Sequence, residues 1–157
     1  MVYKSTERSI SMAKKKVWGL AFSISLLSML AIYGLAMDFE FLKYEVNEKN
    51  QLVMYDGLNG PNPIINSDVS EEQESLSVLG SYLSQFNRWF LAGILIAPFF
   101  IASYYLLFSE KWMGNHPKKK KYLSWTLSAN GVVIAVAVLV WNRYIELVNE
   151  AYHQVLF

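Results

Sequence analysis

Hydrophobic residues in this chain are gathered into three long windows that contain no Asp, Glu, Lys or Arg. The windows cover residues 17–37, 89–108 and 123–141. Each is close to the roughly 20 residues that an α-helix needs to cross a bilayer core of about 30 Å. Uncharged apolar runs of this length favour membrane spans over the buried helices of a soluble core. The pattern therefore predicts an all-α membrane protein with three transmembrane helices.

Aromatic side chains mark the edges of the three windows. Trp and Tyr rings favour the headgroup level of a bilayer, where the ring meets apolar surroundings and its polar atom stays hydrated. All five tryptophans lie near a window edge, at Trp18, Trp89, Trp112, Trp125 and Trp141. A soluble core gives no reason for this placement, so the aromatic residues support three spans.

Basic and acidic residues alternate between the segments outside the windows. Residues 1–16 and 109–122 together hold ten of the 14 Lys and Arg, whereas residues 38–88 hold nine of the 13 Asp and Glu. Because basic loops stay in the cytoplasm, we expect the N-terminus and the 109–122 loop inside, and residues 38–88 and the tail 142–157 outside. The lysines that we assign to this topology and to anionic lipid headgroups are Lys14, Lys15, Lys16, Lys118, Lys119, Lys120 and Lys121.

The first window has a second interpretation. Three lysines before an apolar run resemble a signal peptide, and Gly34 and Ala36 supply small residues for a cleavage after Ala36. The run is longer than the usual signal-peptide core of about 7–15 residues. We therefore favour an uncleaved anchor, while cleavage would leave two spans.

Small residues within the windows indicate how the spans pack, because membrane helices associate through close approach of their backbones. They recur at three- or four-residue steps in each window. These helix-packing positions are Gly19, Ser23, Ser25, Ser28, Gly93, Ala97, Ser124, Ser128, Gly131 and Ala135. Two interpretations stay open: the three helices pack on one another, or they dock onto a partner subunit.

Two residues depart from the apolar pattern inside the spans. Pro98 lacks a backbone N–H and predicts a kink near residues 94–97, which we interpret as static rather than as a hinge. Asn130 is the strongly polar side chain at depth in the third window, and a hydrogen bond between helices is favoured over a transport site. No Asp, Glu, Lys, Arg or His lies in any window, which argues against a proton relay, an ion-coupled carrier and a voltage sensor.

Residues 38–88 form the one sizeable segment between spans. Strand-forming residues on either side of Asn47–Asn50 predict a β-hairpin over about 39–55. A lone two-stranded hairpin is marginally stable in water, so it must pack on a neighbour. Ser70 and Gln73 fit a capping box with Ser70 as the N-cap. A helix over about 71–88 is therefore predicted to run on into the second span.

Apolar residues at three- and four-residue steps continue the second and third spans beyond the membrane. We call them the outer interaction stripe: Leu76, Leu79, Leu83, Phe86, Ile145, Val148 and Tyr152. This spacing also predicts a helical tail over 142–157. Either the stripe packs on itself and on the hairpin, or it docks another protein.

Candidate chemistry is sparse. The chain has no cysteine, which excludes a disulfide or thiolate site, and a net charge of +1 gives no reason to bind nucleic acid. Its two histidines, His116 and His153, lie in segments expected on opposite sides of the membrane. The paired carboxylates fit a solvated acidic face better than an acid–base site, at Asp38, Glu40, Glu71, Glu72 and Glu74. We therefore assign no catalytic, cofactor-binding or metal-binding residue and expect no cofactor or small-molecule substrate.

Together these patterns favour a non-enzymatic accessory or scaffold subunit of a larger assembly in the plasma (inner) membrane. The partner is either another membrane protein or further copies of this chain. One alternative is a membrane immunity protein that blocks a toxin at the outer face. A less favoured alternative is a holin-like self-assembling pore, and an enzyme acting on lipid or envelope substrates is favoured least.

Overall fold

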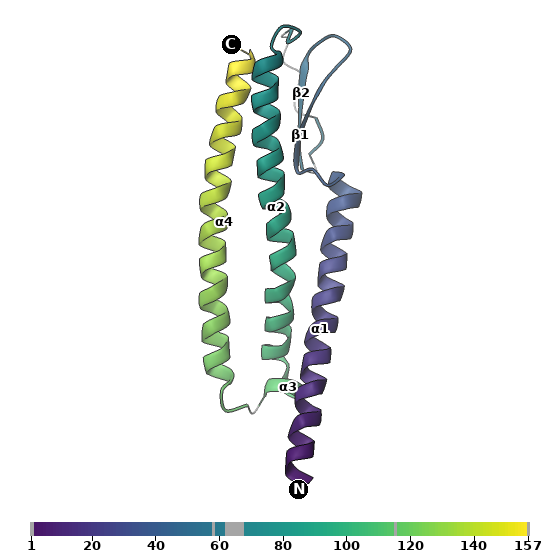
Figure 1. Cartoon of the computed structure of the whole chain (residues 1–157), viewed down its shortest axis with the longest axis vertical. Coiled ribbons are helices and arrows are strands. Elements are labelled where there is room, and N and C mark those ends of the chain that lie inside the picture. Colours follow the sequence, from purple (N-terminus) through teal and green to yellow (C-terminus); the bar gives the residue numbers. More distant parts are fainter. Residues whose placement is uncertain (1, 58, 62–67, 115, 157) are drawn as a thin grey trace. The chain divides into compact units, whose positions relative to one another are not determined.

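The chain is mostly helical, with one small hairpin. The computed structural model describes residues 2–57, 59–61, 68–114 and 116–156, with side chains from residue 12 onward. Its elements, in chain order in Figure 1, are α1 (Val2–Met37), β1 (Leu42–Val46), β2 (Leu52–Asp56), α2 (Gln73–Phe108), α3 (Glu110–Met113) and α4 (Lys119–Leu156). The chain divides into two compact units. The helical unit comprises Met1–Leu30 and Gly93–Ala135, and the hairpin unit comprises Ala31–Ala92 and Val136–Phe157.

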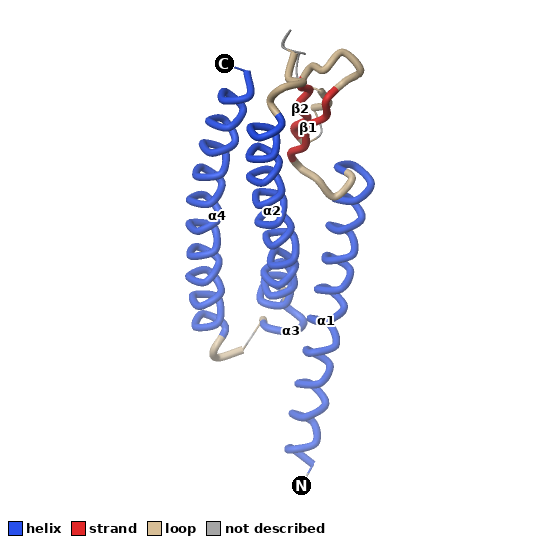
Figure 2. The backbone as a smooth tube through the Cα atoms, turned by 45° about the horizontal axis from the view of Figure 1, so that its top comes forward, coloured by secondary structure: helices blue, strands red, loops and turns tan. Residues whose placement is uncertain are grey.

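Three helices are long and apolar enough to cross a membrane. They are Met12–Met37 within α1, and the whole of α2 and α4, which Figure 2 separates by colour from the two strands. This confirms the prediction of a mostly helical chain with three candidate spans and a hairpin. By length and composition the three helices indicate a membrane location.

Each long helix extends beyond its uncharged window. The helix predicted over about 71–88 and the second span form the single 36-residue α2. The third span and the predicted tail helix form the single 38-residue α4. α1 already begins at Val2, so the basic N-terminal segment is helical as well. Ala36, the last residue before the alternative cleavage point, lies in the last turn of α1.

The chain reverses immediately after α1, where the sequence pattern predicts the first strand. Asp38 and Phe39 have φ angles of 52° and 60°, in the left-handed region that side chains with a Cβ rarely adopt. The Phe39 N–H donates to the Tyr33 carbonyl at 3.2 Å, and its ring fills the space above Gly34, where a Cβ would lie 2.6 Å from it. The strand predicted from Phe39 is therefore wrong at its first residues, and β1 starts at Leu42.

The hairpin itself forms as predicted, with β1 antiparallel to β2 in the register Val46↔Leu52 to Leu42↔Asp56. Asn47 shapes the turn because its side-chain oxygen accepts the N–H groups of Lys49 at 3.0 Å and Gln51 at 2.9 Å. Asn50 has a φ of 56°, which asparagine tolerates better than most residues. These local bonds fix the register of a loop that has no glycine.

The N-terminus of α2 differs from the predicted capping box. The helix begins at Gln73. The carbonyl of Glu72 accepts the Leu76 N–H at 2.9 Å, and its carboxylate accepts the Ser75 hydroxyl at 3.1 Å. Ser70 instead donates its N–H to the Asp68 carboxylate at 3.0 Å. The residue at the helix start is thus Glu72, because Asp68 holds Ser70 in a preceding turn.

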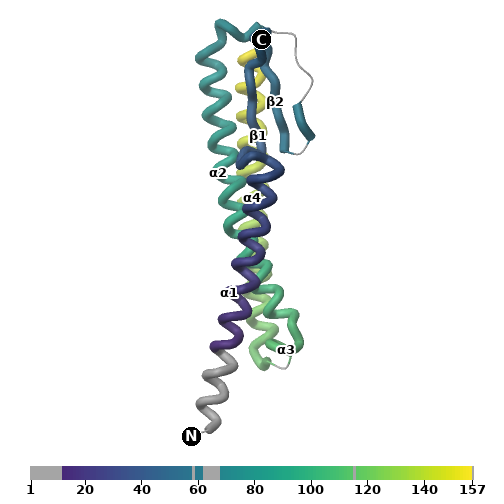
Figure 3. Tube along the Cα trace, turned by 90° about the vertical axis from the view of Figure 1, so that its right-hand side faces the viewer, coloured from purple at the N-terminus to yellow at the C-terminus, as the bar shows by residue number. Residues whose placement is uncertain are grey.

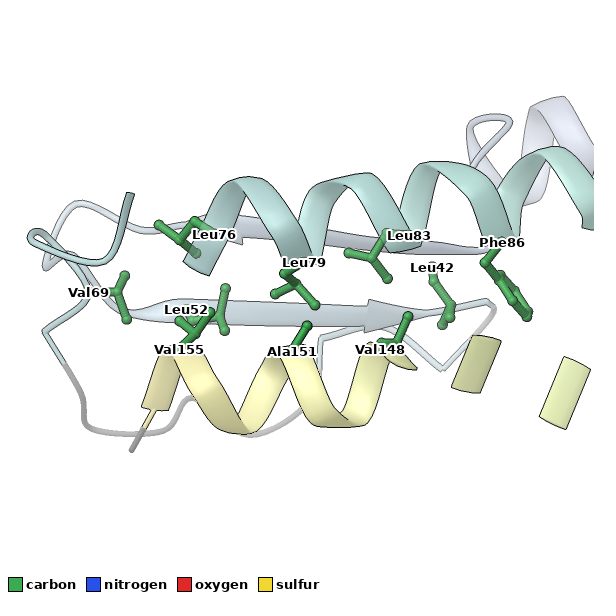
Figure 4. Close-up of a cluster of buried hydrophobic side chains, with 10 residues drawn as sticks. All are labelled: Leu42, Leu52, Val69, Leu76, Leu79, Leu83, Phe86, Val148, Ala151 and Val155. Carbon is green, nitrogen blue, oxygen red and sulfur yellow. The ribbon is translucent and has the colours of Figure 1, made fainter. Parts of the chain in front are cut away.

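An apolar cluster holds the hairpin unit together. Figure 4 shows side chains of α2 and α4 pointing toward one another with those of the strands between them. The cluster consists of Leu42, Leu52, Val69, Leu76, Leu79, Leu83, Phe86, Val148, Ala151 and Val155. Ile145 and Tyr152 pack against it while partly exposed. All seven residues of the outer interaction stripe therefore pack inside the hairpin unit, and the stripe is not a free docking surface.

Within the helical unit, α1 contacts α2 and α3 at the end that carries the lysines. The Trp18 indole donates to the Ser103 hydroxyl at 3.2 Å, and its ring meets Phe99 edge-on at 5.5 Å between centroids. The Lys14 ammonium lies 3.7 Å from the Met113 sulfur. Figure 3 shows α3 in the connection between α2 and α4, a short helix that the sequence pattern did not predict.

Leu79 gives a direct test of this core. It is 0% exposed in the middle of the cluster, so Leu79→Ala should destabilise the hairpin unit by about 2–5 kcal/mol. Val78→Ala on the same helix is the matched control, because Val78 is 38% exposed. Hydrogen exchange of the β1 and β2 amides in detergent should accelerate in the first variant alone. Equal acceleration in both variants would contradict the assigned core.

Candidate interaction surfaces

The side chain of Asn87 joins the start of the hairpin to α2. Its oxygen accepts the N–H groups of Phe41 and Leu42, both at 3.0 Å. Its amide nitrogen donates to the Leu42 carbonyl at 2.7 Å. One amide thus satisfies three backbone groups at the first residue of β1. Since unpaired backbone groups are costly when removed from water, Asn87 fixes where the strand meets the helix.

An aromatic cluster lies beside this junction in the hairpin unit. Phe41 is at its centre, with centroid distances of 4.5 Å to Phe90, 5.6 Å to Trp141 and 6.0 Å to Phe86. Tyr33 meets Phe90 at 5.5 Å. Offset and edge-on aromatic pairs contribute roughly 0.5–1.5 kcal/mol beyond the burial of their area. These rings, which include Trp141 at a window edge, therefore hold parts of α1, α2, α4 and the residue before β1 together.

Three titratable groups of the hairpin unit that lie outside the uncharged windows have displaced pKa values. Hydrogen bonds from the Ser70 side chain, and next from its N–H, lower the pKa of Asp68. The turn is therefore stabilised at pH values above the ordinary Asp pKa, and it loses this contribution as the pH falls through the lowered pKa. A hydrogen bond to Glu45 at 3.0 Å raises the pKa of Tyr55. Burial raises the pKa of Tyr152. Each shift has a structural cause, and none lies in a cleft with a second reactive group.

Asn130 makes the hydrogen bond between helices that its position predicts. Its amide nitrogen donates to the Tyr104 hydroxyl at 3.1 Å, which links α4 to α2 inside the helical unit. Typical bonds of this kind between membrane helices contribute about 0.6–2 kcal/mol. The contact supports a structural role for Asn130 over the alternative of a transport site.

The small residues singled out for helix packing are mostly exposed within the chain. An added Cβ at Gly19, Gly93 or Gly131 would meet no atom within 4 Å. Gly19, Ser25 and Ala97 are half-buried, whereas seven of these positions are exposed: Ser23, Ser28, Gly93, Ser124, Ser128, Gly131 and Ala135. The glycines thus make no close backbone approach inside the helical unit. Docking of this surface onto a partner stays a prediction.

Pro98 lies on the buried face of α2 instead of a lipid-facing one. Its ring is almost completely buried, and α2 continues through it from Gln73 to Phe108. Ile94 and Ala102, one turn to either side, are also buried at 8% and 0% exposure. The kink stays a prediction, but its position on the packed face favours a static role over a gate.

From residue 12 onward, the basic residues of the helical unit form no ion pair within it. The two ion pairs among the described residues, Lys43–Glu45 and Arg143–Glu146, both belong to the hairpin unit. Lys15 and Lys16 are exposed, as are Lys118, Lys120 and Lys121, while Lys14 and Lys119 are half-buried. Unpaired ammonium groups at one end of an apolar helical unit match the headgroup and topology role predicted for them.

The carboxylates considered for acid–base chemistry do not converge on a site. Asp38, Glu40, Glu71 and Glu74 are exposed, and Glu72 is half-buried at the start of α2. No group of three or more His, Asp or Glu residues suited to a metal ion occurs among the described residues. His116 accepts the Lys118 N–H at 3.3 Å and lies beside Tyr122, whereas His153 lies beside Tyr152. The two histidines belong to different units.

Sequence reasoning missed the residues that make the structural contacts. Asn87 sits next to Phe86 of the stripe, but Gln85 and Arg88 on either side are polar as well, so the sequence did not single it out. Ala102 is fully buried in α2, but a single alanine in an apolar span carries no distinguishing pattern. Tyr104 pairs with Asn130, a contact that depends on which face of α2 meets α4.

The chain matches no protein-family model, no curated protein and no solved structure. Its function is therefore argued from the residues and their geometry alone.

Asn87 can be tested by a substitution that keeps its size. Asn87→Leu removes the partners of the Phe41 and Leu42 backbone groups and should cost about 1–3 kcal/mol. The amides of Phe41 and Leu42 should lose protection against exchange before those of the distal turn. Ser84→Leu introduces the same side chain at an exposed position of α2 and should leave both amides protected. Unchanged protection in Asn87→Leu would show that the junction does not depend on this amide.

Proposed function

We propose that this chain is a non-catalytic accessory subunit of a larger assembly in the plasma (inner) membrane. The observation that carries the proposal is the face of α4 formed by Ser124, Ser128, Gly131 and Ala135. All four residues are exposed, although small residues are the ones that membrane helices use for close approach. The face is thus suited to a neighbouring helix that this chain does not itself supply.

The geometry of α4 supports this argument. Asn130 faces α2 through its bond to Tyr104, and half-buried Leu123, Thr126 and Val133 share its side of the helix. At about 100° per residue, Gly131 and its small neighbours project away from that side. The chain therefore uses one face of α4 for its own packing and leaves the small-residue face for a partner.

The uncharged spans also favour a structural role. Carriers, proton relays and voltage sensors place ionisable groups at depth, and residues 17–37, 89–108 and 123–141 contain none. Asn130, the strongly polar residue in the third span, already has a partner in Tyr104. These features support an accessory subunit over a transporter.

We further propose that the N-terminus and the 109–122 loop lie in the cytoplasm and that the C-terminus lies outside. Ten of the 14 basic residues fall in the two proposed inner segments, as the positive-inside rule requires. The hairpin, the first turns of α2 and the last turns of α4 then form the extracytoplasmic part.

The orientation can be tested with single cysteines, since the chain has none of its own. Lys49 and Lys120 are both exposed and lie in segments proposed to be on opposite sides. A membrane-impermeant maleimide applied to intact cells stripped of any outer barrier should label Lys49→Cys at once. It should label Lys120→Cys only after the membrane is opened. The reverse pattern would overturn the proposed orientation.

The accessory role predicts co-purification that depends on the small-residue face. A tagged chain in mild detergent should retain a stoichiometric membrane partner, identified by mass spectrometry, and Gly131→Leu should release it. The substitution should not disturb the fold, because a Cβ at Gly131 meets nothing within 4 Å. Ala129→Leu, at an exposed position on another face of α4, is the control that should keep the partner.

Two results would contradict the accessory role. The first is a wild-type chain that purifies alone as a monomer, because an accessory subunit should retain its partner. The second is a partner that Gly131→Leu retains as well as the wild-type chain does, because such a partner does not bind the proposed face. A discrete homo-oligomer without any other protein would instead favour a self-assembling pore or a stand-alone protective protein.

A further inference from the structure

A groove of about 580 Å³ runs along the helical unit. Its walls come from α1, the last turns of α2 and the short helix α3, and its apolar part is lined by Val17, Leu20, Ala21, Ile24, Ile101 and Tyr105. The α1 residues recur at three- and four-residue steps, so they share one face of that helix. Ile101 and Tyr105 are one turn apart on α2 and form the opposite wall.

The groove carries a charged residue at one end. Ser109, Lys111 and Trp112 line it where α2 passes into α3. The Lys111 ammonium lies over the Trp112 ring, 5.3 Å from its centroid. Lys14 brings a second ammonium to the same helix through its contact with Met113 at 3.7 Å. Away from this end, the α1 wall is apolar except for Ser25.

Neither ion pair among the described residues includes Lys111 or Lys14. Glu110, the neighbouring acid on α3, is exposed and does not line the groove. The groove therefore combines a long apolar wall with the Lys111 ammonium, which has no carboxylate partner among the described residues. Lys14 does not line the groove, but it adds a second ammonium to the neighbouring helix α3.

We infer that this groove binds one anionic phospholipid, with its phosphate at Lys111 and an acyl chain along α1. Charge complementarity selects the occupant, because an anionic headgroup supplies the counter-charge that the helical unit lacks. The apolar wall selects a lipid over a free phosphate, since Leu20, Ile24 and Tyr105 are 63%, 57% and 58% exposed. The inference uses the membrane location but neither the accessory role nor the orientation.

Native mass spectrometry of the full tagged chain in mild detergent can test this inference. The probes are phosphatidylglycerol and phosphatidylcholine with identical acyl chains, offered in equal amounts. The wild-type chain should retain one phosphatidylglycerol in preference to phosphatidylcholine. Lys111→Gln should reduce that preference about fivefold, the usual effect of one basic residue near an anionic membrane surface. Lys120→Gln removes an exposed lysine that does not line the groove and should leave the preference unchanged.

A second variant tests the acyl-chain wall separately. Ala21→Phe fills the groove and should lower retention of both lipids, whereas Ala31→Phe, at an exposed position of α1 outside the groove, should not. Circular dichroism of each variant confirms that the helices are intact. Soluble glycerol phosphate in excess should fail to displace the lipid.

Three outcomes would overturn the inference. Equal retention of the two lipids by the wild-type chain would remove the role of charge. Equal effects of Lys111→Gln and Lys120→Gln would show a diffuse surface attraction with no built site. Displacement by glycerol phosphate alone would show a phosphate site that makes no use of the apolar wall.

Discussion

Backbone amide and carbonyl groups must find their hydrogen bonds within the protein wherever a chain crosses hydrocarbon, and this requirement determines the form of the three long helices. Each uncharged window is helical throughout, and Pro98, which removes one such bond, has its ring on the packed face of α2. The same requirement applies to polar side chains at this depth, and the Asn130 amide meets it by donating to the Tyr104 hydroxyl. The apolar windows and the few polar contacts within them therefore follow from one physical cause.

The hairpin unit depends on helices that do not end where the uncharged windows end. α2 begins well before its window and α4 continues well after its own, and these additional turns carry Leu79, Leu83, Val148 and Val155 into one cluster. A two-stranded hairpin alone is only marginally stable. β1 and β2 are stable here because their side chains join this cluster and because the Asn87 amide donates to the Leu42 carbonyl. The outer interaction stripe, one of whose two interpretations was a docking surface, supplies apolar contacts that stabilise the hairpin.

Periodicity and charge were enough to predict the spans, the continuous α2 and the hairpin, because these depend on local pattern and on the thickness of a bilayer. The start of α2 was misplaced since Asp68 competes with the helix for Ser70, and a capping pattern does not reveal such a competitor. The first strand was started too early because Phe39 turns back onto Gly34. Contacts between distant segments, such as Asn87 with Leu42 or Lys14 with Met113, depend on which faces meet, and one sequence does not specify that.

The core of the hairpin unit contains only apolar side chains, with no buried polar or charged residue among those the structure describes. Its ion pairs, Lys43–Glu45 and Arg143–Glu146, are exposed and of the kind that contributes little to stability. Acidification destabilises proteins mainly by protonating carboxylates that the native state uses, and salt acts mainly on exposed charges. This unit is therefore held together by burial of apolar side chains, a force that responds weakly to acidity and to salt, so its fold should tolerate wide changes in both.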